Sequence, residues 1–210
     1  MDGTELVEAV RASKATELER LGKEKALVAA TDADLSTGAV LRAAAASERR
    51  AQRTFEAWAE SEPNEAARES FERVAALEAD HYDRVVAHLD DPPSDPEPDP
   101  LHASLRGIER TVERVGAGLV GRPMASERTL LQVVNFFVNE ADDATANLFR
   151  EFREETRELS GEGAALLDEL CSGDEDWVLA RKAAEDAVQV AYDDYAEALQ
   201  GMGLDPKPVC

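Results

Sequence analysis

Apolar residues recur at helical spacing along almost the whole chain, and this pattern predicts an all-α protein. Ala, Leu, Glu and Arg dominate the sequence, while runs of β-branched residues are short. Ser36 or Thr37 is a typical N-cap, and Pro63 suits a tight turn followed by a new helix. The expected helices, in chain order, cover residues 4–30, 36–62, 63–89, 101–119, 126–160, 163–171 and 174–201.

One segment interrupts the helical pattern decisively. Residues 91–100 hold five prolines in ten positions and are predicted to form a linker. Long helices precede and follow it, so the sequence predicts a single domain of two antiparallel helical hairpins joined by a long crossover. In chain order we expect an extra N-terminal helix (1–35), a first hairpin (36–90), the linker and crossover (91–123), a second hairpin (124–203) and a tail (204–210).

Three polar residues interrupt the apolar stripes of the second and third predicted helices. Glu48 lies in the stripe of the second helix, and Glu78 and His81 lie in that of the third. Glu78 and His81 are three residues apart and therefore share a helix face. Glu48 and Glu78 are each fifteen residues from the turn at Pro63, or about 22 Å at 1.5 Å per residue. The spacing predicts that all three side chains meet inside the protein.

Buried carboxylates need compensation, and a metal ion can provide it. Oxygen and imidazole ligands suit iron or manganese, and a Glu on one helix facing Glu-x-x-His on the next is half of the di-metal arrangement in ferritin-like bundles. Glu-x-x-His also arises by chance in a chain so rich in Glu, so a Glu–Arg or Glu–His hydrogen bond at the edge of the bundle is the alternative.

These residues carry a resemblance to the rubrerythrin family. The segment 41–55, LRAAAASERRAQRTF, resembles the first site helix of rubrerythrins, and the segment 71–89 resembles the second. The likeness covers residues 40–89, roughly a quarter of the chain. It implies a ferritin-like four-helix bundle with a di-iron site that reduces peroxide or oxygen. By the same resemblance, Glu48, Glu78 and His81 would be iron ligands.

The second half of the chain departs from that family pattern. Glu140 lies on an apolar stripe and weakly resembles the ligand of the third site helix, but no His follows His102, so a second Glu-x-x-His cannot exist. Three alternatives are therefore left open for the site: it binds one metal ion, it binds a pair of ions weakly, or it binds no metal. No CxxC pair is present to form a rubredoxin module, so an iron enzyme would need an external electron donor.

The charge of the chain limits its partners. The 210 residues carry a formal net charge of −22, which argues against binding to nucleic acids or to anionic membranes. The chain has only five lysines, and acidic, lysine-poor surfaces favour solubility in concentrated salt. We therefore expect a protein of an extreme halophile; an ordinary acidic protein is the alternative. A cytoplasmic location is expected because the sequence shows no apolar run long enough to span a bilayer and no signal-peptide pattern at residues 1–5. Cys171 and Cys210 are too few for a disulfide framework, and Cys210 is expected to be a free thiol or to have a redox or intermolecular disulfide role.

Two functions of different classes follow from these observations. The first is a rubrerythrin-like iron oxidoreductase with Glu48, Glu78, His81 and Glu140 as metal ligands. The second is a non-catalytic ferritin-like bundle whose metal site has decayed and which acts as a scaffold or regulatory partner. The N-terminal helix could pack across the bundle or form the contact of a homodimer.

Overall fold

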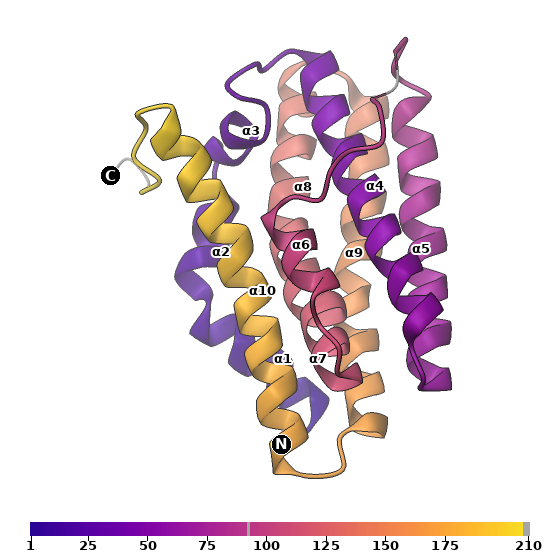
Figure 1. Cartoon of the computed structure of the whole chain (residues 1–210). Coiled ribbons are helices and arrows are strands. Elements are labelled where there is room, and N and C mark those ends of the chain that lie inside the picture. The colour runs from indigo at the N-terminus through magenta and orange to yellow at the C-terminus, as the bar shows by residue number, and fades with distance from the viewer. Residues whose placement is uncertain (92, 208–210) are drawn as a thin grey trace.

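The computed structural model describes residues 1–91 and 93–207, and this part of the chain is all-helical, as predicted (Figure 1). Within the described residues no helix is long and apolar enough to cross a bilayer. Cys210 and Pro92 lie outside the described residues. The elements are α1 (Gly3–Ser13), α2 (Ala15–Leu21), α3 (Lys25–Ala30), α4 (Thr37–Ser61), α5 (Glu65–Val86), α6 (Pro100–Arg106), α7 (Thr111–Val115), the π-helix η1 (Gly116–Gly121), α8 (Arg122–Asn139), α9 (Asp143–Leu170) and α10 (Asp174–Gly201).

The first hairpin consists of α4 and α5, and its helices confirm the sequence prediction closely. Ser36 caps α4 by accepting a hydrogen bond from the Ala39 amide at 3.3 Å, and Asn64 caps α5 in the same way through the Ala67 amide at 3.0 Å. The residues between the helices form a tight turn around Pro63. Residues at equal sequence distances from this turn therefore lie at the same level along the two helices.

The second hairpin consists of α8 and α9, and here the predicted boundaries are wrong. The predicted helix over 126–160 is broken after Asn139, where Ala141 adopts a left-handed conformation with φ of 58° and Asp142 caps α9. The helix α9 then continues through Ser160 and Gly161, where the sequence predicted an end. The chain reverses at residues 140–142 because of this local backbone conformation. The sequence gives no sign of the turn, since these residues include no proline or glycine.

The remaining helices form a layer outside the two hairpins. The helix α10 packs on η1, α6 and α7, and α1, α2 and α3 each contact both α10 and a helix of the second hairpin. Figure 1 shows these helices beside the two hairpins. The predicted N-terminal helix over 4–30 is therefore three short helices, with breaks at Lys14 and at residues 22–24. The range 124–203 is not one hairpin, since α10 leaves the hairpin of α8 and α9 and covers it from outside.

The π-helix η1 brings the crossover into close contact with α10. In a π turn, residues five apart lie nearly on the same face, and Gly116 and Gly121 both face α10. A Cβ atom on Gly121 would lie 2.3 Å from the carbonyl oxygen of Ala184, so only glycine permits this approach. Pro123 has no amide hydrogen for a regular i→i−4 bond, which favours a widened turn before it. The extra residue of the π turn rotates Arg122 by about 100° relative to a continuous α-helix.

Candidate metal centre

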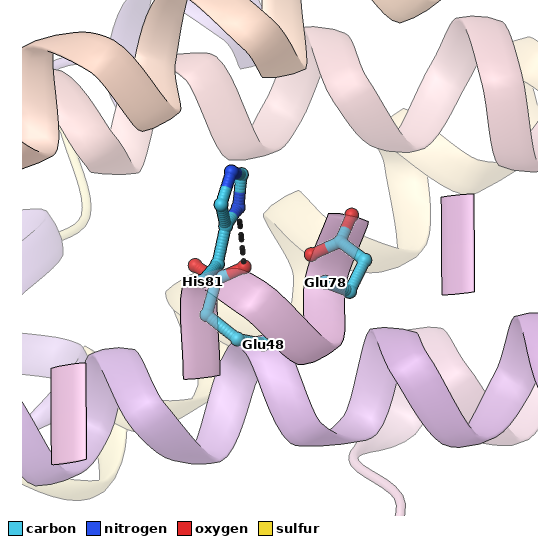
Figure 2. Close-up of side chains that lie close together, drawn as sticks. All are labelled: Glu48, Glu78 and His81. Atoms are coloured by element: carbon cyan, nitrogen blue, oxygen red, sulfur yellow. Dashed lines mark ion pairs between the residues drawn. The ribbon is translucent and has the colours of Figure 1, made fainter. Parts of the chain in front are cut away.

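Glu48, Glu78 and His81 come together between α4 and α5, as their spacing predicts. The exposed fractions of the three residues are 7%, 2% and 0%, and one ligand atom from each lies within 4.8 Å of the others. Figure 2 shows Glu48 rising from α4 to face the side chains of α5. Alanines surround Glu48 on its helix, which leaves room for its carboxylate between the two backbones.

The imidazole of His81 is hydrogen-bonded through one ring nitrogen and faces Glu48 through the other, a contact that Figure 2 marks as an ion pair. Its Nε2 atom donates a hydrogen bond to Oε2 of Glu155 on α9 at 2.7 Å, and its ring stacks on Phe152 with a centroid distance of 4.0 Å. Its Nδ1 atom lies 3.5 Å from Oε2 of Glu48 and makes no hydrogen bond within the described residues. Metal-binding histidines characteristically give their second ring N–H to a carboxylate, which orients the free nitrogen. Nδ1 is oriented in this way toward Glu48 and Glu78.

A buried arginine occupies the other side of the cluster. Nη2 of Arg122 donates to Oε1 of Glu78 at 2.7 Å, and the exposed fraction of Arg122 is only 3%. Its guanidinium also lies over the ring of Phe55, 5.1 Å from the centroid. Arg122 thus places a permanent positive charge beside Glu78, on the side where the second hairpin faces the first.

The three ionisable groups perturb one another strongly. Burial raises the pKa of Glu78 to about 8, with the charge of Arg122 opposing the shift and Glu48 adding to it. Burial alone would lower the pKa of His81, but the carboxylates of Glu48, Glu78 and Glu155 outweigh it and raise the pKa to about 9. Burial would likewise raise the pKa of Glu48, but His81, Glu78 and Arg122 together lower it. At neutral pH the metal-free cluster therefore holds one proton on Glu78 and one extra proton on His81.

The fourth predicted ligand, Glu140, lies elsewhere. It is exposed and caps the C-terminus of α8 at the turn into α9, outside the cluster of Glu48, Glu78 and His81. This correction follows from the break in the predicted helix, since Glu140 was placed on an apolar stripe that ends at Asn139. Sequence reasoning missed Glu155 and Arg122, which the second hairpin contributes instead. The local signal for Arg122 was the glycine-rich segment 116–121 followed by Pro123.

No protein-family model, curated protein or solved structure matches the chain. The resemblance to rubrerythrins stays a prediction drawn from residues 40–89, and the function has to be argued from the site itself.

Proposed function

We propose that this protein binds one divalent transition-metal ion through the carboxylates of Glu48 and Glu78 and Nδ1 of His81. The observation that carries the proposal is the buried Nδ1 atom, which faces Glu48 at 3.5 Å and makes no hydrogen bond to any residue that the structure describes, while Nε2 is held by Glu155. A set of two carboxylates and one imidazole suits iron, manganese, cobalt or zinc. The resemblance to rubrerythrins favours iron among them.

The charges of the cluster support a dication in particular. A metal ion requires an ionised Glu78 and a neutral His81, so its binding releases the two protons that these groups hold near pH 7. Exchange of two protons for one divalent ion leaves the net charge of the buried cluster unchanged. The protein therefore does not need to bury additional uncompensated charge when the metal binds.

The charge of Arg122 opposes a second ion in the same buried site. A second dication beside Glu78 would lie next to the guanidinium, and repulsion between two unscreened positive charges is strong in a buried site. The second hairpin also places Phe152 against His81, where it offers no ligand atom. Arg122 and Phe152 thus lie beside Glu78 and His81, and neither side chain can supply the ligands of a second Glu-x-x-His motif.

We propose further that α4, α5, α8 and α9 are the core of a ferritin-like four-helix bundle. Side chains from all four helices contribute to one apolar cluster, and residues 87–121 form the long connection between the two hairpins. The helices α1, α2, α3 and α10 are additions to this core.

The activity that fits these proposals is reduction of peroxide or oxygen by an iron oxidoreductase. Bound ferrous iron would supply one electron on reaching the ferric state, whereas reduction of hydrogen peroxide to water consumes two electrons and two protons. An external electron donor would have to provide the balance. The protein's own groups would position the ion, with Glu155 orienting His81 and Arg122 neutralising Glu78.

The experiment that tests metal binding is anaerobic reconstitution of the purified full chain with ferrous iron in concentrated salt. After removal of free iron, elemental analysis is expected to find close to one ion per chain. Glu48→Gln and His81→Gln are each expected to lower the bound iron to the level of a buffer blank, because each removes a ligand. The matched controls are Glu140→Gln and His88→Gln, which change exposed residues of the same types.

The second candidate function, a metal-free scaffold or regulatory partner, is favoured by the buried hydrogen bond from Arg122 to Glu78, which joins the two hairpins without any metal. If wild-type protein and all four variants retain equal, blank-level iron while remaining folded, the metal proposal is wrong and the scaffold is the function left.

A further inference from the structure

A cavity of about 430 Å³ lies between the two hairpins and the outer layer of helices. It is bounded by α3, α4, α6, α8 and α10, and Glu48, Glu78 and Arg122 are among the residues that line it. This volume lies within the range of cavities that enclose small organic molecules. The cavity therefore connects the candidate metal centre to a space large enough for a ligand.

Small and aliphatic side chains make up most of the walls of this half-open cavity, and the hydroxyl groups of Ser47, Ser126, Thr129 and Thr156 lie among them. The walls come from helices on both sides, so the outer layer, which the proposed four-helix core does not require, contributes part of the lining. The larger aliphatic lining residues are Leu21, Leu27, Val40, Leu101, Leu130 and Val133. Such walls favour an apolar ligand body.

His102 adds a hydrogen-bond acceptor to this cavity. The residue lines the cavity with an exposed fraction of 3%, and its Nδ1 atom lies 2.7 Å from Oδ1 of Asp99. Burial lowers the pKa of His102, with Arg122 and Arg50 adding to the effect and Asp99 opposing it. The neutral ring donates Nδ1–H to Asp99, which leaves a lone pair on Nε2. Nε2 is buried and makes no hydrogen bond within the described residues.

The charged groups of the lining disfavour an anion. Four carboxyl groups, those of Glu48, Glu78, Asp99 and Asp194, line the cavity together with two arginines. Both arginines are already engaged: Arg122 donates to Glu78, and Arg50 donates to the carbonyl of Glu97 and pairs with Asp99. An anionic ligand would face a surplus of negative charge and a chain of net charge −22.

We propose that this cavity binds a small uncharged molecule with an aliphatic body and a hydroxyl group that donates a hydrogen bond to Nε2 of His102. The inference rests on the proposed function in one respect only: a bound molecule would lie beside the metal ion and so be its substrate or effector. The binding itself depends on the cavity and on His102, and is present with or without metal.

The test uses the full-length protein without added metal and a series of linear alcohols from 1-propanol to 1-hexanol, with affinities measured by ligand-observed NMR titration. Burial of each added methylene is expected to tighten binding about fourfold. Comparison of the isomers 1-pentanol and 1-methoxybutane separates the contribution of the hydroxyl group to the affinity from that of the aliphatic body. The alcohol is expected to bind about fivefold more tightly than the ether, because only the alcohol can donate to Nε2.

Variants locate the binding within the protein. Ala191→Leu fills part of the cavity and is expected to weaken 1-pentanol binding about tenfold. Ala196→Leu is the matched control, since Ala196 is also half-buried on α10 and, like Ala191, packs against the apolar group of Leu21, Ala26, Ala125, Tyr195 and Leu199, but does not line the cavity. His102→Phe is expected to abolish the preference for the alcohol over the ether. His102→Gln, which retains an acceptor, should restore part of it.

Each outcome decides one proposal. Absent or length-independent binding of the alcohols, or equal effects of Ala191→Leu and Ala196→Leu, overturns the cavity as a ligand site. An alcohol preference that survives in His102→Phe overturns the assigned role of His102. Normal iron loading alongside absent alcohol binding would refute this inference and leave the metal centre intact, and the converse result would refute the metal centre alone.

Discussion

The two hairpins contribute different chemistry to the same buried cluster. The first hairpin, α4 and α5, supplies all three potential ligands, Glu48, Glu78 and His81. The second hairpin, with α8 and α9, supplies a fixed positive charge from Arg122 and an orienting carboxylate from Glu155. A symmetric di-metal centre would draw ligands equally from both hairpins. Under the proposed function, the second hairpin orients and neutralises the ligands of one ion where a di-metal centre would have a second set of ligands.

This asymmetry also affects protons. The clustered groups of the first hairpin hold two protons at neutral pH, because burial raises the pKa of Glu78 and neighbouring carboxylates raise the pKa of His81. The groups of the second hairpin hold His81 and Glu78 in position from outside the ligand set. The comparison can be tested by changing three properties separately: the protonation of Glu78 and His81, the charge of Arg122, and the orientation of the His81 ring.

The largest effect is expected from pH. Lowering the pH keeps Glu78 and His81 protonated, and both protons must leave before the metal binds, so the affinity should rise with pH until it levels off near pH 9. Between pH 6 and 8 we expect the affinity for Co²⁺ to rise about 10- to 100-fold per pH unit. Competition titrations against a chelator of known affinity measure this slope. A flat profile across this range would show that the ligands hold no protons to release.

The next effect is expected from the fixed charge. Arg122→Met removes the positive charge beside Glu78 and leaves this carboxyl without its buried partner. The free energy of unfolding of the metal-free protein at neutral pH is expected to fall by up to about 3 kcal/mol, measured by denaturant unfolding, because the buried carboxyl loses its hydrogen-bond donor. Bound Co²⁺ should recover part of this loss, because the ion replaces the missing charge. Weaker metal binding in Arg122→Met than in the wild type would contradict the view that the ion and Arg122 can replace each other as the positive charge beside Glu78.

The smallest effect is expected from the orienting carboxylate. Glu155→Ala frees the imidazole of His81 and is expected to weaken metal binding about 10- to 100-fold without abolishing it. Glu158→Ala, which changes an exposed carboxylate on the same helix, is the matched control and should bind metal like the wild type. Equal metal affinities in Glu155→Ala and Glu158→Ala would show that the carboxylate of Glu155 has no role in metal binding.

The difference between the hairpins also explains how far sequence reasoning reached. Glu48, Glu78 and His81 could be placed together because one tight turn separates their helices, and the rise of 1.5 Å per residue fixes their relative heights. Glu140 was misplaced because the chain reverses at Ala141, a residue with no strong preference for the left-handed conformation it adopts. Without the correct end of α8, the level of every residue on the second hairpin was uncertain.

The sequence by itself determined the all-helical class, the first hairpin and the convergence of its three polar residues, since these depend on local periodicity and on one short turn. Only the tertiary structure decided that Arg122 and Glu155 complete the cluster and that α3 and α10 line part of a cavity beside it. These features depend on how helices separated by a long crossover pack against each other. Such packing is set by the shapes of whole surfaces, which no short-range pattern along the chain encodes.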